Sequence, residues 1–222
     1  MELLKLYNHQ AFVDEVKPDF NKLYKRISKD YQNDELSYIF NECVSECSNT
    51  VNFKASFMLL PLQITCKNID FNVFNVNSSA LSKNLSGCDN CIIFGATSGV
   101  GLDRVIDRYS QISPLKAFIC QSIGAEYIEE YCDLLCDYFK KTQNCYTRPR
   151  FSPGYSDLSL DVQKKLFDLL SLPKSCGLTL TESLIMRPSK SVTAFVGLSD
   201  KPCSAYNKCS QCDRSKCEFK NI

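Results

Sequence analysis

The segment RPRFSPGYSD, residues 148–157, places two prolines, a glycine and two arginines within ten residues. Pro149 and Pro153 restrict the backbone, so this loop loses little conformational entropy when it orders. Gly154 permits a positive φ or the close approach of a ligand. Arg150 can hold a carboxylate through two hydrogen bonds, and Tyr155 offers a flat face and a hydroxyl group. These residues indicate a pocket for an anionic small molecule, although a structural turn with a surface arginine explains the same pattern equally well.

Two blocks of sequence resemble the activation domain of cobalamin-dependent methionine synthase, also called its reactivation domain. The first is Arg150–Tyr155, which is similar to the family pattern R-x-x-P-G-Y, and the second is Leu178–Ser183 followed by Pro188-x-x-Ser191-Val192. The similarity is best over residues 95–197. It implies an α+β fold, a C-shaped domain with a twisted antiparallel sheet and grouped central helices. We expect residues 1–200 to form this domain and residues 201–222 to form a cysteine-rich, metal-binding tail.

The same resemblance implies a binding site for S-adenosylmethionine. Arg150 would hold the methionine carboxylate, and Gly154 and Tyr155 would shape the backbone contacts beside it. A helical glutamate of the family contacts the methionine end of the ligand, and an ungapped alignment places Glu129 there. The choice of glutamate stays open, because Glu126 and Glu130 are neighbours on the same predicted helix.

The last twenty residues contain four cysteines in the spacing C-x5-C-x2-C-x4-C, namely Cys203, Cys209, Cys212 and Cys217. Four thiolates suit a zinc ion or an iron–sulfur cluster. Structural zinc sites usually split into two C-x2-C pairs separated by a dozen or more residues. The compact run therefore favours a 4Fe–4S cluster over zinc, and unligated thiols remain a third possibility. We interpret the separate pair Cys88 and Cys91 as structural.

These features lead to a functional hypothesis. The chain would be an S-adenosylmethionine-binding subunit that supports reductive methylation of a partner, a methionine synthase or related corrinoid methyltransferase. Cobalamin would lie only on that partner, because the single histidine, His9, lacks the D-x-H-x-x-G motif of the cobalamin-binding domain. A flavodoxin or ferredoxin would donate the electron, and no nucleophile–base pair indicates a self-contained active site. The alternative is a small iron–sulfur electron carrier or a metal-dependent interaction module built on the tail.

Composition narrows the remaining possibilities. The formal net charge is +1, which gives no electrostatic reason to expect a nucleic-acid partner. No apolar run approaches the length of about 18 residues that spans a bilayer, and the N-terminus lacks the pattern of a signal peptide. We therefore expect a cytoplasmic protein. Reduced thiols prevail in that compartment, and we expect ten of the 14 cysteines to be small buried hydrophobic residues.

A glycine pattern in CIIFGATSGVGL, residues 91–102, raises one more possibility, a nucleotide-binding loop. Gly95, Gly99 and Gly101 have the spacing of short-chain dehydrogenases. No tyrosine, however, is followed four residues later by the lysine that this class needs. We interpret the segment as a tight turn from a strand into a helix.

Hydrophobic periodicity and capping residues predict the main elements. Helices are expected over 33–49, 102–110, 113–141 and 159–171, and strands over 53–64, 69–76, 91–96, 177–186 and 191–198. No element is predicted within the first 32 residues.

Overall fold

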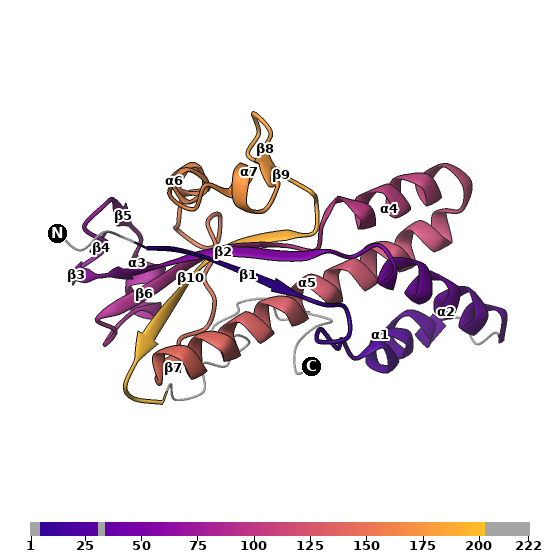
Figure 1. The fold of residues 1–222 in the computed structure, drawn as a ribbon, viewed down its shortest axis with the longest axis horizontal. Coiled ribbons are helices and arrows are strands. Elements are labelled where there is room, and N and C mark those ends of the chain that lie inside the picture. Colours follow the sequence, from indigo (N-terminus) through magenta and orange to yellow (C-terminus); the bar gives the residue numbers. More distant parts are fainter. Residues whose placement is uncertain (1–4, 31–33, 203–222) are drawn as a thin grey trace.

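The computed structural model describes residues 5–30 and 34–202 (Figure 1). Its centre is a five-stranded sheet in the order β1-β2-β6-β10-β7. The strands are β1 (Leu6–Ala11), β2 (Phe53–Pro61), β6 (Asn90–Thr97), β10 (Ser191–Ser199) and β7 (Tyr146–Thr147). Every neighbouring pair is antiparallel, with Phe57 opposite Phe94 and Ala194 opposite Phe94 on its other side.

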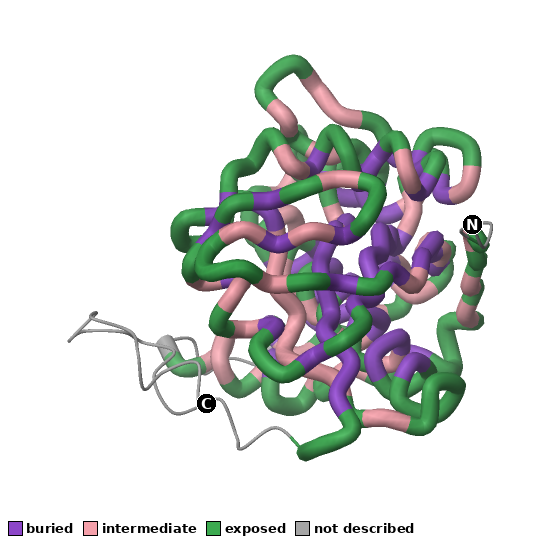
Figure 2. Tube along the Cα trace, turned by 90° about the vertical axis from the view of Figure 1, so that its left-hand side faces the viewer, coloured by how far each residue is buried: buried purple, intermediate pink, exposed green. Residues whose placement is uncertain are grey.

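Both faces of this sheet are covered, and the side-chain alternation of β6 explains why the strand is apolar throughout. Ile92 and Phe94 belong to a hydrophobic cluster on the helical face, whereas Cys91 and Ile93 belong to a second cluster on the opposite face. Successive side chains of a strand point to opposite faces, so a strand covered on both sides has no polar face. Figure 2 shows the buried residues concentrated in the interior, with exposed loops around them.

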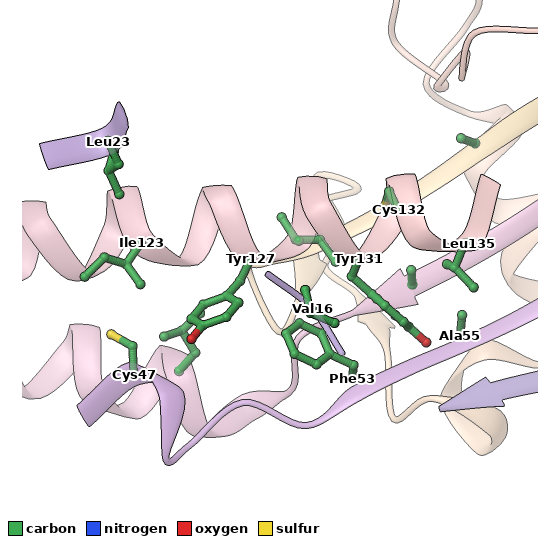
Figure 3. Close-up of a cluster of buried hydrophobic side chains, with 14 of the residues drawn as sticks. Val16, Leu23, Cys47, Phe53, Ala55, Ile123, Tyr127, Tyr131, Cys132 and Leu135 are labelled. Atoms are coloured by element: carbon green, nitrogen blue, oxygen red, sulfur yellow. The ribbon is translucent and has the colours of Figure 1, made fainter. Parts of the chain in front are cut away.

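Four helices build the first face: α1 (Phe20–Ile27), α2 (Asp34–Ser48), α4 (Val100–Ile112) and α5 (Pro114–Gln143), with a 3₁₀ turn at Ser28–Asp30. The 30-residue helix α5 runs along the sheet (Figure 1). As predicted, Ser113 caps it by accepting a hydrogen bond from the Lys116 backbone N–H, and Pro114 occupies its first turn. Figure 3 shows Tyr127 and Tyr131 of α5 pointing toward Phe53 of β2.

The second face carries smaller elements. They are a three-stranded sheet of β3 (Gln63–Thr65), β4 (Asn68–Asp70) and β5 (Asn75–Asn77), the helices α3 (Ser79–Asn84), α6 (Val162–Leu169) and α7 (Leu172–Ser175), and the hairpin of β8 (Thr179–Leu180) and β9 (Met186–Arg187). In Figure 1, α6, α7 and the hairpin lie on the side of the sheet away from α5. The mixed composition, the curled antiparallel sheet and the grouped helices α4 and α5 confirm the predicted α+β fold class.

Four local predictions were wrong. The single strand predicted over 53–64 is divided into β2 and β3, which belong to different sheets. Residues 1–32 contain the strand β1 and the helix α1, which the sequence did not indicate. The predicted strand over 177–186 is two short strands joined by a turn, where Leu184 has a φ of 62°. The predicted strand over 69–76 is likewise divided by a turn at Asn72, whose φ is 65°.

The glycine segment is a tight strand-to-helix turn, as predicted. β6 ends at Thr97 and α4 begins at Val100, and between them Gly99 has a φ of 89°. A Cβ atom on Gly101 would lie 2.3 Å from the Thr50 carbonyl oxygen. The glycines therefore serve close packing of backbone on backbone. Among the described residues, no helix is both long enough and apolar enough to cross a membrane.

Candidate functional site

The loop that follows β7 runs beside the outer edge of β10. The Arg148 backbone N–H donates to the Gly197 carbonyl at 2.8 Å. Phe151 and Phe195 exchange two backbone hydrogen bonds of 3.0 and 2.8 Å. The rigid central sheet therefore fixes the position of Arg150, which lies between these two anchors.

Gly154 closes a compact turn after this segment. Its φ of 84° is a conformation that favours glycine, and its N–H donates to the Leu158 carbonyl at 2.9 Å. The next side chain, Tyr155, is 69% exposed. Its ring meets that of Phe151 edge-on, with a centroid distance of 6.0 Å. The turn thus presents an aromatic face to solvent.

Arg150 binds two carboxylates of α5. Its Nη2 lies 2.6 Å from Glu129 Oε2, and its Nη1 lies 2.5 Å from Asp133 Oδ1. The arginine side chain is only 14% exposed, whereas those of Glu129 and Asp133 are 64% and 68% exposed. The two carboxylates therefore lie on the solvent side of a largely buried guanidinium group.

The electrostatics keep this guanidinium charged. Burial lowers the pKa of Arg150, but nearby negative charge, including the carboxylates of Asp133 and Glu129, raises it above its ordinary value. Burial raises the pKa of the Cys136 thiol to about 11 and also raises the pKa of the Cys132 thiol. The thiols are consequently neutral at physiological pH, and the charge balance of the cluster rests on Arg150, Glu129 and Asp133.

This arrangement complements the amino-acid end of a small molecule. A guanidinium group with an adjacent carboxylate can bind an α-carboxylate and an α-ammonium at the same time. The structure brings together the predicted Arg150 and Glu129, with Gly154 and Tyr155 further along the same loop. It also adds Asp133, which the sequence reasoning missed. Asp133 follows Glu129 by four residues on a helix, a spacing that places both on one face and could have identified it.

The structure also shows which of the neighbouring Glu126, Glu129 and Glu130 pairs with Arg150. Glu126 forms an ion pair with Arg26 of α1, so it is engaged elsewhere. Burial raises the pKa of Glu130, and the nearby Asp133, Asp137 and Glu126 add to that effect. Of the three, Glu129 has the ion pair with Arg150.

The second sequence block has a structural role in the fold. Asp103, at the start of α4, accepts hydrogen bonds of 2.7 Å from both the backbone N–H and the hydroxyl of Ser189. The Ser191 hydroxyl donates to the Pro188 carbonyl at 2.7 Å, and its oxygen lies 2.9 Å from the Thr97 hydroxyl oxygen. These bonds fix the start of β10 against the β6–α4 turn.

A hollow of about 440 Å³ lies at a different place, near the end of the central sheet. Its lining includes Asp89, Cys145, Arg148 and Lys201, but none of the four predicted ligand-binding residues. The hollow is therefore separate from the predicted site, where Glu129 and Tyr155 are exposed to solvent.

The predicted metal ligands Cys203, Cys209, Cys212 and Cys217 lie outside the described residues. Within 5–30 and 34–202, no group of three or more histidine, cysteine, aspartate or glutamate side chains could hold a metal ion. Ten cysteines lie in this part of the chain, and eight of them are buried, including Cys88 and Cys91. The exceptions to the predicted burial are the exposed Cys66 and the partly buried Cys145.

Comparisons with known proteins are consistent with this architecture. A protein-family model described as the activation domain of vitamin B12-dependent methionine synthase matches residues 83–220. Among solved structures, the crystal structure of the MetH reactivation domain bound to AdoHcy has a similar fold, with a TM-score of 0.67. It is 17% identical in sequence, and the alignment covers 90% of this chain and 80% of that chain. No curated protein sequence matches.

Proposed function

Because this chain belongs to the family of vitamin B12-dependent methionine synthase activation domains, we propose that it binds S-adenosylmethionine for the reductive methylation of a corrinoid-carrying partner. Arg150 holds the methionine carboxylate, and Glu129 holds the ammonium group. Gly154 gives the ligand close access to the backbone, and Tyr155 covers it from one side. The chain supplies the binding site, and the partner supplies the reacting cobalt.

The observation that carries this proposal is the ion pair between Arg150 and Glu129. The two residues are 21 positions apart in sequence, and the fold brings them to 2.6 Å at a site open to solvent. A cation held in a mostly buried position is preorganised for a ligand anion, because little side-chain freedom remains to be lost on binding. Charge-assisted hydrogen bonds to both ends of the amino-acid group would orient the ligand.

The partner is a methionine synthase or related methyltransferase that carries the corrinoid. Restoring an oxidised, inactive corrinoid takes one electron and one methyl group. S-adenosylmethionine supplies the methyl group, and a flavodoxin or ferredoxin supplies the electron. The open position of the site, beside a loop on the surface, suits a ligand whose methyl group must reach a second protein.

The test is calorimetric titration of the anaerobically purified protein with S-adenosylmethionine. We expect saturable binding that Arg150→Ala weakens at least tenfold, about 1.4 kcal/mol. Arg104→Ala is the matched control, because it removes an exposed arginine from α4 and should leave the affinity unchanged. Thermal unfolding of each variant verifies that it is folded. Absence of binding by the wild type up to millimolar ligand would contradict the proposal.

A second proposal concerns the tail. The spacing of Cys203, Cys209, Cys212 and Cys217 supports a 4Fe–4S cluster that receives the electron near the partner's corrinoid, with zinc as the alternative metal. Iron analysis of anaerobically purified protein tests this directly. Protein without iron whose cysteine-to-serine variants reactivate the partner normally would exclude the cluster.

A further inference from the structure

Both terminal nitrogens of Arg150 already donate to protein carboxylates in the free protein. Nη1 donates to Asp133 and Nη2 donates to Glu129. A ligand carboxylate that binds the guanidinium end-on needs these same two nitrogens. A third carboxylate at this guanidinium would lie beside two like charges, so we expect the ligand to bind best when one protein carboxylate leaves its position.

We propose that Asp133 is a placeholder, which occupies the carboxylate subsite of Arg150 until the amino-acid end of the ligand displaces it. This inference rests on the proposed function and assigns a role to a residue outside the resemblance. Asp133 is a positioning residue: it keeps the guanidinium oriented and neutralised in the free protein and competes with the ligand for it.

The choice between Glu129 and Asp133 depends on which carboxylate must stay beside Arg150 after the ligand has bound. The ligand brings an ammonium group within a few bonds of its carboxylate, so one protein carboxylate must stay beside the guanidinium to receive it. Glu129 has the longer side chain and can turn toward the ammonium while it remains near Nη2. Asp133 is one methylene shorter and one helical turn further along α5, and we assign the exchange with the ligand carboxylate to it.

The exchange is energetically feasible because Asp133 is 68% exposed. A solvent-exposed carboxylate keeps much of its hydration, so its ion pair contributes little net free energy. The ligand carboxylate replaces that bond on Arg150, while Asp133 returns to water. The buried guanidinium is thus paired both before and after binding, and an unpaired buried charge would be costly.

The proposal predicts that removing the negative charge of Asp133 increases the affinity for a cationic ligand. Removal of a negative charge near a site for a cationic ligand ordinarily weakens binding. Asp133→Asn removes a competitor instead, so we expect S-adenosylmethionine to bind more tightly, on the order of fivefold. Glu129→Gln should weaken binding, because it removes the partner of the ammonium group.

The experiment is titration of the full chain and its variants with two probes, S-adenosylmethionine and 5′-methylthioadenosine, which lacks the amino-acid end. Asp137→Asn is the matched control, because Asp137 lies one turn further along α5 and pairs with Lys140 instead of Arg150. We expect Asp133→Asn to gain affinity for S-adenosylmethionine alone and Asp137→Asn to gain none.

Each outcome is informative. Binding by the wild type with no gain, or with a loss, in Asp133→Asn overturns the placeholder and leaves the proposed function intact. An equal gain for 5′-methylthioadenosine also overturns it, because that probe brings no carboxylate. Binding by neither the wild type nor Asp133→Asn overturns the proposed function and the inference together.

Discussion

At the scale of single residues, Tyr155 is the exposed aromatic residue of the candidate site. Its ring forms a T-shaped pair with that of Phe151, and its exposed surface is available to a planar group such as adenine. We expect Tyr155→Ala to weaken S-adenosylmethionine binding by about 1 kcal/mol, roughly fivefold, and Tyr155→Phe to retain most of the affinity. Tyr38→Ala, which removes a similarly exposed tyrosine from α2, serves as the control in the same titration. Equal affinities for Tyr155→Ala and the wild type would remove Tyr155 from the site.

The single histidine allows a pH prediction that can be assigned to one residue. His9 lies in β1, with Nδ1 3.2 Å from the Tyr131 hydroxyl and its ring edge-on to Tyr138 at 5.0 Å. Burial lowers the pKa of His9, and Glu15 only partly opposes this. A lowered pKa means that the folded state disfavours the charged form. The histidine therefore contributes stability above its unfolded pKa of about 6.5, and this contribution is lost as the pH falls through the folded pKa.

Urea unfolding at about pH 5.5 and pH 7.5 measures this effect. When the pH is lowered from about 7.5 to about 5.5, the free energy of unfolding should fall more in the wild type than in His9→Gln. Carboxylates titrate in both proteins, so the difference between them isolates the histidine. An identical pH dependence in both proteins would show that the ring is solvated equally in the folded and unfolded states.

The site residues show what sequence can and cannot provide at this scale. Arg150, Gly154 and Tyr155 lie close together in the sequence, so a sequence motif can identify them. The partner of Arg150 lies on another element, and which of three adjacent glutamates faces it depends on the rotation of α5 about its axis. That rotation is fixed by the buried side of the helix, where Tyr127 and Tyr131 pack against Phe53.

At the scale of elements, two helical glycines allow a matched comparison of packing. A Cβ atom on Gly101 of α4 would meet the Thr50 carbonyl oxygen at 2.3 Å, and a backbone atom cannot move aside cheaply. A Cβ atom on Gly124 of α5 would meet Leu102 Cδ2 at 2.6 Å and the Lys190 side chain at 3.1 Å, which are ends of flexible side chains.

Alanine is favoured over glycine in a helix by up to about 1 kcal/mol, so the two effects oppose each other. We expect Gly101→Ala to destabilise the protein by about 1–3 kcal/mol, because the clash with backbone outweighs the helix preference. Gly124→Ala should cost clearly less, since the side chains can adjust. Chemical unfolding of both variants decides this, and an equal or larger loss in Gly124→Ala would contradict the explanation.

The elements that the sequence predicted are those buried on a full face. The apolar run of β6 and the periodic pattern of α5 are long, and tertiary contacts agree with them. β1 was missed because it is an edge strand without a clean apolar alternation, and its residues are mostly exposed or half-buried. The turn within 177–186 was missed because Leu184, with a φ of 62°, is not a residue that normally indicates a turn.

At the scale of the whole molecule, one sheet organises both hydrophobic clusters. The strands β2, β6 and β10 contribute side chains to both clusters, to the one under α5 from one face of the sheet and to the one under α6 from the other. The loop of residues 148–157 comes after α5 and β7 and follows the outer edge of β10 toward α6, so it connects the two faces. The position of Arg150 therefore depends on the helical face and on the sheet together, which local sequence could not establish.

Among the residues that the structure describes, the last buried residue of either cluster is Leu198. From this we predict that a chain ending at Pro202 keeps its free energy of unfolding within about 0.5 kcal/mol and its affinity for S-adenosylmethionine. The same truncation removes Cys203, Cys209, Cys212 and Cys217, so any iron or zinc bound by the full chain should be lost with it. Elemental analysis and urea unfolding of both chains provide the comparison. A large loss of stability without a bound metal would show that residues after 202 pack on the domain, and the boundary predicted near residue 200 would then be wrong.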